Sequence, residues 1–428
     1  MKFYLSDVIS SKFRERACSP TPNLPTSQPP TLRPLLKETI ADYTILTDVK
    51  NAKGYVFISQ IIWLWMSASL FAALLLTLGS PQAYPYQLWK DPGHIGLGDR
   101  SVFRFYACSG AKTGGVVNPP DPGKDSQVAQ MQALPPGSMD NVGFSTLSIG
   151  GNNVGFSRVL KSCIFFDLSS CGEERARTES RIASAELQTN LTNTYRQIIA
   201  LMPVINFKLY VTGYAKFFNA VDERCNDKKF VPAFGAELTT ALREWVNDDV
   251  IALNIAINQA INTVNQEMVA AGSQKFIRYV DIDAQYENHR FCDPWPNWKS
   301  DAWFFAPATA DETAQTGTSP NWNYSIFNDT GTVDLTQIDP DTCTDDADNN
   351  DDWGQMFMCG FAQYYAENNA TIDPSQIYYS DPSDGDALPS SFQFNLFLPT
   401  WIEKSFHPKS IGLGSEAFKI WLYWFIHY

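Results

Sequence analysis

The chain has few histidines, no close cysteine pair and few basic residues, and these shortages limit the chemistry it can carry. Its 428 residues include four histidines and eight cysteines, and no two cysteines form a Cys-x-x-Cys pattern. Zinc sites are usually built from such clusters, so we expect no metal site, and nothing indicates a cofactor. Lysine and arginine number 32 against 46 acidic residues, a net charge of −14. With this balance and no basic stripe, we expect no nucleic-acid partner.

Residues 1–54 lack the hydrophobic periodicity of helices and strands and are dense in proline, which predicts a disordered tail. The first residues also lack the apolar core of a signal peptide. Charge is then absent from 55–78, a run long enough for a single-pass transmembrane helix. Lys50 and Lys53 precede it, so the positive-inside rule would leave the tail cytosolic and the rest outside. The alternative is that this run replaces a signal peptide or exon lost in gene annotation.

Beyond Tyr84, short β-like runs alternate with helical ones. The clearest helix is 238–272, where apolar residues recur at steps of three and four. Such alternation predicts an α/β fold, a three-layer α/β/α sandwich whose parallel sheet is covered on both faces. The predicted strands are Val102–Tyr106, Phe144–Ile149, Phe207–Thr212 and Phe276–Ile282.

The pattern also predicts how the chain is organised. Residues 293–391 are rich in Trp, Asn, Asp and Pro with little periodicity, which indicates a long loop-rich insertion. The last residues, 418–428, are almost wholly apolar or aromatic. The predicted division is a disordered tail at 1–54, an apolar segment at 55–80, a folded domain at 81–417 and an aromatic tail at 418–428.

Small residues follow two of the predicted strands, where an α/β sheet opens to ligands. The run Ser-Ile-Gly-Gly-Asn-Asn-Val-Gly-Phe occupies 148–156, and its Asn152 offers a side-chain N–H to a developing oxyanion. Gly110 ends the run Ala-Cys-Ser-Gly, and His407 lies in Phe-His-Pro towards the C-terminus. Each also has a plainer interpretation, as a turn-forming glycine or asparagine or as a surface histidine.

The order of these motifs, with Val-Thr-Gly-Tyr at 211–214 and His-Arg-Phe-Cys at 289–292 between them, resembles the SGNH (GDSL-type) hydrolases. The likeness is strongest to their secreted fungal lipase- and esterase-like members and runs over most of the chain. It implies an SGNH-type domain that hydrolyses esters of a lipid or an acetylated carbohydrate. It also implies that the Gly110 N–H and the Asn152 amide bind the oxyanion and that His407 is the general base.

The chain departs from the family where the nucleophile should stand. The Gly-Asp-Ser block should precede Tyr84, but that space holds the apolar segment. The aspartate that often stands three residues before the histidine is replaced by Lys404, and Asn153 stands where aspartate is usual. The alternative is therefore a catalytically inactive relative that binds a glycan or lipid. Three nearby serines lack the family's motif context or order: Ser80, Ser101 and Ser109.

The resemblance also suggests how the cysteines pair. In related enzymes the partner of Cys108 lies just after the nucleophile block, so Cys108 is left with only the remote Cys18. Four glycosylation sequons begin at Asn190, Asn323, Asn328 and Asn369. Cysteines and sequons together favour the secretory pathway, with the domain extracellular or anchored on the outer side of a membrane. The pairs implied are Cys163 with Cys171, Cys225 with Cys292, and Cys343 with Cys359.

Overall fold

The computed structural model describes most of the predicted domain. The predicted tail at 1–54 and the greater part of the predicted insertion lie outside the described residues. So do Cys18, Cys108, Cys343 and Cys359. The described residues are 55–57, 83–90, 102–107, 110–118, 125–140, 142–231, 235–306, 360, 363–364, 367–368 and 406–427.

Five parallel strands form the centre of the described part. Three pair in the order β3-β4-β5, and β1 pairs with β2. Strand β1 also contacts β3, so the two groups lie side by side. Parallel neighbours need crossover connections, which the helices provide. All four predicted strands are confirmed, with shorter ends. The strands are β1 (Tyr55–Phe57), β2 (Phe103–Phe105), β3 (Phe144–Leu147), β4 (Lys208–Thr212) and β5 (Phe276–Val280).

Strand β1 corrects the interpretation of the apolar segment. The sequence predicts a transmembrane helix over 55–78, but Tyr55 pairs with Phe103 in a parallel ladder and opens a strand. Aromatic and β-branched residues suit a strand, and a strand buried on both faces is also free of charge. Residues 58–80 lie outside the described part. Within the described residues, no helix is long and apolar enough to cross a membrane.

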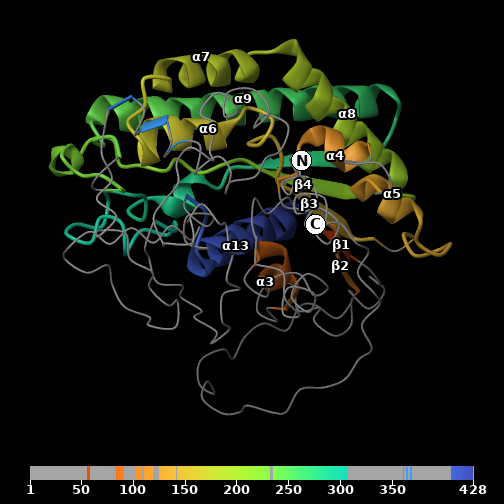
Figure 1. Ribbon diagram of the computed structural model, residues 1–428. Coiled ribbons are helices and arrows are strands. Elements are labelled where there is room, and N and C mark those ends of the chain that lie inside the picture. Colours follow the sequence, from red (N-terminus) through yellow and green to blue (C-terminus); the bar gives the residue numbers. More distant parts are fainter. Residues whose placement is uncertain are drawn as a thin grey trace, which may run out of the picture.

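Helices cover both faces of the sheet, as Figure 1 shows with α8 and α9 above it and α13 and α3 below. Successive strand residues point to opposite faces: Leu209 and Val211 join the core beneath α8 and α9, whereas Tyr210 joins the core against α13. The predicted three-layer α/β/α architecture is therefore what the chain adopts. The covering helices are α3 (Tyr84–Lys90), α4 (Thr113–Val117), α5 (Gln127–Gln132), α8 (Ala185–Leu201), α9 (Thr240–Ala270) and α13 (Ser410–His427).

The long helices begin at polar caps. Helix α8 starts after Ser184, whose hydroxyl accepts the N–H of Leu187 at 3.1 Å, and α9 starts after Thr239, which caps the N–H of Leu242 at 3.2 Å. Such caps satisfy backbone donors that the first turn leaves unpaired. The predicted helix 238–272 is thus confirmed as α9. The C-terminal residues predicted as a separate aromatic tail belong to α13, which begins before them.

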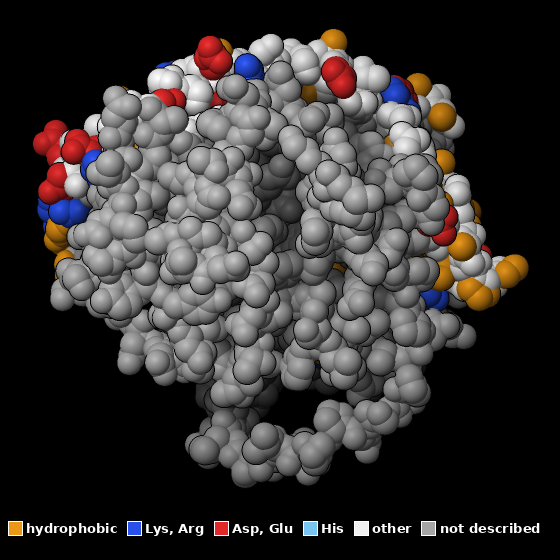
Figure 2. All heavy atoms as spheres, in the orientation of Figure 1, with side chains coloured by type: hydrophobic (Ala, Val, Ile, Leu, Met, Phe, Trp, Pro, Cys, Tyr) orange, Lys and Arg blue, Asp and Glu red, His pale blue; other side chains and the backbone are white. Residues whose placement is uncertain are grey.

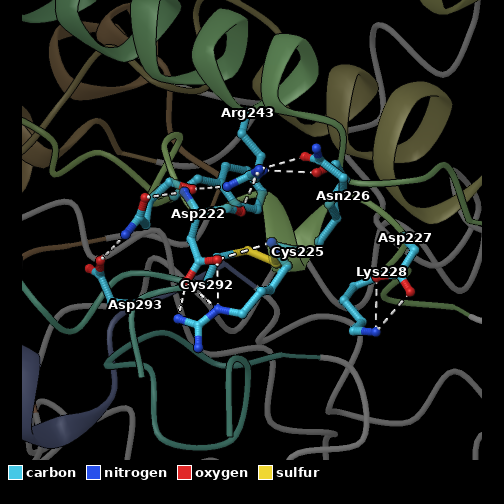
Figure 3. The surroundings of a disulfide bond; sticks show 12 residues. Asp222, Cys225, Asn226, Asp227, Lys228, Arg243, Cys292 and Asp293 are labelled. Atoms are coloured by element: carbon cyan, nitrogen blue, oxygen red, sulfur yellow. Dashed lines mark hydrogen bonds and ion pairs between the residues drawn. A yellow bond between two sulfur atoms is a disulfide. The ribbon is translucent and has the colours of Figure 1, made fainter. Parts of the chain in front are cut away.

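Two disulfides fix the shorter elements, and both are among the predicted pairs. Cys163–Cys171 joins the π-helical turn η2 to α7, and Cys225–Cys292 joins the end of η3 to the loop beyond η4. Figure 3 shows the second disulfide beside Arg243, which reaches down from α9. The elements concerned are α6 (Phe156–Leu160), η2 (Lys161–Phe165), α7 (Cys171–Ile182), η3 (Glu223–Cys225) and η4 (Asp283–Tyr286).

The outer surface of the upper helices carries charges of both signs. Figure 2 shows acidic and basic side chains mixed along the rim where Figure 1 draws α7 and α9. On α7, Arg175 pairs with Glu179 at 2.9 Å, one turn along the helix. Such exposed pairs contribute little to stability, but they keep this face hydrated. The face therefore does not resemble a phosphate-binding surface.

Candidate functional site

The turn after β3 is held in shape by glycines and by the neighbouring loop. Gly150 and Gly155 have φ values of 125° and 77°, which side chains disfavour. Between them, Asn152 donates its amide N–H to the carbonyl of Ala111 at 3.2 Å. The adjacent Gly110, with φ 69°, is therefore brought beside the Asn152 turn.

Asn153 fastens the same turn a second time. Its Oδ1 accepts the backbone N–H of Thr113 at 3.0 Å, and its Nδ2 donates to the Thr113 hydroxyl at 2.7 Å. The amide thus uses both of its polar atoms on one residue at the start of α4. Asn153 therefore ties the turn after β3 to the start of α4.

Tyr214 supports the turn from β4. Its hydroxyl accepts the N–H of Gly151 at 2.9 Å, and its backbone N–H and carbonyl bind the Asn254 side chain at 2.8 and 2.7 Å. Burial raises the pKa of Tyr214 to about 12, so the hydroxyl keeps its proton at neutral pH. Gly213 leaves room beside it, because a Cβ there would clash with the Tyr279 hydroxyl and with Oδ1 of Asn254.

His407 is buried, at 6% exposed, in the loop that leads into α13. Its carbonyl accepts the N–H of Phe305 at 2.8 Å, and the Phe305 carbonyl accepts the N–H of Phe406 at 2.7 Å. Phe406 has a φ of 67° and packs edge-on against Phe217 and other rings. These contacts fix the backbone on which the histidine stands.

Asn152 and His407 line the same cavity, whereas Gly110, which was predicted to join them, is not among the residues that line it. The cavity lies at the carboxyl ends of the strands, since Ser148 follows β3, Gly213 and Tyr214 follow β4, and Ile282 follows β5. This is where ligands bind in open parallel sheets. The described lining is otherwise mostly apolar and includes Val154, Phe156, Leu160, Ile182, Phe217, Val250, Leu253, Phe304 and Leu413.

Two buried acids in this lining were missed by the sequence analysis. Glu416 of α13 accepts the Tyr286 hydroxyl at 2.6 Å, and burial raises its pKa to about 7 although this hydrogen bond opposes the shift. Burial, with a contribution from Glu179, raises the pKa of Asp249 of α9 to about 6. One signal could have identified Glu416, because it is the sole acid in the largely apolar sequence of α13.

His289, the other histidine in a sequence motif, does not line the cavity. Its ring stacks on the Trp303 ring with centroids 3.8 Å apart. Partial burial lowers the pKa of His289. Ser80, Ser101 and Ser109 lie outside the described residues. Within the described part of the chain, no group of His, Cys, Asp or Glu could hold a metal ion.

Known proteins similar to this chain are bacterial lipases, although no protein-family model matches it. Lipase 1 of Streptomyces coelicolor is 26% identical over 239 residues, covering 55% of this chain and 72% of that protein. A lipase of Streptomyces rimosus is 24% identical over 218 residues, covering 50% of this chain and 65% of that protein. These matches support an ester hydrolase of the lipase type. The likeness to fungal members stays a prediction.

Two crystal structures of Streptomyces enzymes also resemble the chain. Phospholipase A1 from Streptomyces albidoflavus has a TM-score of 0.41 and 24% identity over 60% of this chain and 87% of its own. The extracellular lipase from Streptomyces rimosus has a TM-score of 0.42 and 21% identity, and the likeness covers 60% of this chain and 88% of that one.

Proposed function

We propose that this chain is by family an SGNH-type ester hydrolase of the lipase kind, with its site at the Asn152–His407 cavity and its nucleophilic serine not found in the sequence. The observation that carries the proposal is that these two residues, far apart in the sequence, line one cavity at the carboxyl edge of the sheet. Asn152 and Gly110 are the oxyanion donors, and His407 is the general base. Lipase relatives support the same reaction class.

The reaction would proceed by two acyl transfers. A serine activated by the His407 imidazole attacks the ester carbonyl, and the oxyanion is bound by the Asn152 amide and the Gly110 N–H. The intermediate collapses by expelling the alcohol, which takes the proton held by His407, and water activated by the same imidazole then hydrolyses the acyl-serine to the free acid. The sequence contains no Gly-Asp-Ser to supply that serine. Without its nucleophile, such a site loses several orders of magnitude in rate, so the chain as written should show trace activity at most.

The cavity wall favours a lipid ester over an acetylated carbohydrate. Most of the described lining side chains are apolar, and none is lysine or arginine. A sugar would leave its hydroxyls unpaired against such a wall, whereas an acyl chain would gain by burial there.

The absence of Gly-Asp-Ser favours a second candidate function, in which an inactive relative binds a lipid without turning it over.

The protein would act in the secretory pathway or outside the cell. Two disulfides within the domain support this location, because disulfides persist in oxidising compartments. One structural relative is described as an extracellular lipase. Membrane anchoring is not part of the proposal, since the segment predicted to provide it begins as strand β1.

Hydrolysis of p-nitrophenyl decanoate by the full chain tests the nucleophile. We expect a rate near background, with no serine labelled by a fluorophosphonate probe. An ordinary enzyme rate that is lost in His407→Ala and kept in His289→Ala would show that the chain has a nucleophile, which peptide mapping of the probe would identify.

Transcript sequencing across codons 45–90 tests the hydrolase origin, because an exon encoding Gly-Asp-Ser would restore the enzyme. If no exon, activity or ester binding is found, the hydrolase proposal fails.

A further inference from the structure

Glu416 is a carboxyl group built into an apolar wall. It lies on α13, is 5% exposed, and lines the cavity together with Asn152 and His407. Its Oε1 accepts the hydroxyl of Tyr286 at 2.6 Å. Tyr286 reaches it because Gly412 leaves room, since a Cβ there would lie 2.8 Å from the Tyr286 hydroxyl. Buried carboxyl groups are costly, so a position that keeps one in this wall calls for an explanation.

No basic side chain neutralises Glu416 from within the described cavity wall. The described lining contains no lysine or arginine, and its other titratable groups are Tyr84, Tyr214, Asp249 and His407. The charged side chains on α13 and on the elements packed against it have other partners than Glu416. The pairs are Lys90 with Trp89, Arg278 with Phe276, Asp283 with Lys216 and Arg290, Lys409 with the Ser300 carbonyl, and Lys419 with Tyr423. Besides Tyr84 and Tyr286, the uncharged titratable tyrosines on those elements are Tyr86 of α3, Tyr279 of β5 and Tyr423 of α13 itself.

We propose that Glu416 is a specificity-determining residue that binds, as a neutral carboxylic acid, an uncharged carbonyl oxygen of a ligand with an apolar chain. It thereby selects esters against fatty-acid anions. The inference deepens the proposed function, because it names the ligand class of the same cavity. It does not need a nucleophile, since it concerns binding alone.

The chemistry of the carboxyl group supports this role. One oxygen accepts from Tyr286, so in the acid form the other oxygen can carry the proton and donate it to a ligand acceptor. An ionised Glu416 cannot donate, and it would repel a ligand carboxylate in a wall of low polarity. The pKa of Glu416 is about 7, so the donor is present below neutral pH and is lost as the pH rises through that value. Affinity for a neutral carbonyl ligand should fall in the same range.

Calorimetric titration of the full chain with 2-nonanone and with nonanoate tests the proposal. The ketone is uncharged, accepts but cannot donate, and is not hydrolysed, so a missing nucleophile does not affect the result. For one titrating donor with a pKa of about 7, the ketone should bind about thirtyfold more weakly at pH 8.5 than at pH 6. Nonanoate should not bind measurably at pH 8.5.

Variants separate Glu416 from the other titrating groups. Glu416→Gln keeps a donor of the same shape, so its affinity for the ketone should no longer change with pH. Asp249→Asn is the matched control and should keep the pH dependence. Tyr286→Phe removes a hydrogen bond that lowers the pKa of Glu416, so it should move the midpoint to higher pH, a shift that a purely structural role would not give. The proposal is overturned if the wild type binds no ketone or shows no pH dependence, or if Glu416→Gln keeps that dependence.

Discussion

At the scale of single residues, Arg243 is the most heavily buried charge described. It is 0% exposed and stands on α9. Its guanidinium donates to the carbonyls of Leu238 at 2.8 Å and Asp222 at 3.0 Å, and to the Asn226 side chain at 2.7 Å. It also binds the carbonyl of Asn219. Figure 3 shows these contacts gathering the loop around Cys225. Burial lowers the pKa of Arg243, but only from a value far above neutral.

Replacing Arg243 should destabilise the protein strongly. Arg243→Met would leave several buried oxygens without a donor, and we expect it to lower the free energy of unfolding by ~3–5 kcal/mol. Urea denaturation, followed by tryptophan fluorescence, measures the free energy of unfolding of each variant. Arg224→Met is the matched control, because Arg224 binds the neighbouring Asp222 with its side chain 57% exposed, and should change little. Similar small losses in both variants would mean that Arg243 does not organise the loop.

At the residue scale, sequence motifs pointed to residues that line the cavity, while their roles stay a prediction. Asn152 and His407 were singled out from the residues around them, and both line the cavity. Glu416 and Tyr214 were not singled out, because their importance depends on partners in other segments. Glu416 bonds to Tyr286, which follows β5, and Tyr214 bonds to Gly151 in the turn after β3. No local pattern records that such residues meet.

At the scale of elements, β2 to β5 and α9 were predicted, whereas β1 was missed. A strand shows in the sequence when its hydrophobic run is bounded by turn residues, but Tyr55–Phe57 opens a longer charge-free run that also fits a helix. The correction affects the search for a nucleophile. Because β1 pairs with β2 and contacts β3, the run expected to be a helix begins within the sheet, so serines that follow this strand in the sequence come into question. Ser59 follows Phe57 by two residues in the sequence and lies outside the described residues, and it is one more serine that probe labelling must distinguish.

The two described disulfides should differ in their contribution to stability. Cys225–Cys292 joins residues 67 apart, and Cys163–Cys171 joins residues 8 apart. Chain entropy predicts about 4 kcal/mol for the longer loop and about 2.5 kcal/mol for the shorter one. Denaturation of the two double Cys→Ser variants measures the order. A larger loss for the shorter loop would show that packing around the sulfurs, not loop closure, dominates.

At the scale of the whole molecule, α13 is a structural layer of the domain. Ile420 is 0% exposed in the core that also contains Phe144 and Tyr210, and Trp424 packs against Phe144. We expect Ile420→Ala to lower the free energy of unfolding by ~2–5 kcal/mol. Ile426→Ala, on the same helix but 63% exposed, should cost less than ~0.5 kcal/mol. Equal losses of unfolding free energy in the two variants, measured by thermal or urea unfolding, would contradict the role of α13 as a structural layer.

The position of α13 in the chain has a consequence for biosynthesis. The ribosome makes the strands first and this helix well after them, so the part of the sheet face that α13 covers stays exposed while the later segments are translated. That face presents Phe144, Tyr210 and Val280, which are buried in the finished protein. Nascent chains with such surfaces aggregate readily. Slow or interrupted translation should therefore make this protein depend on chaperones more than its folded stability alone would indicate.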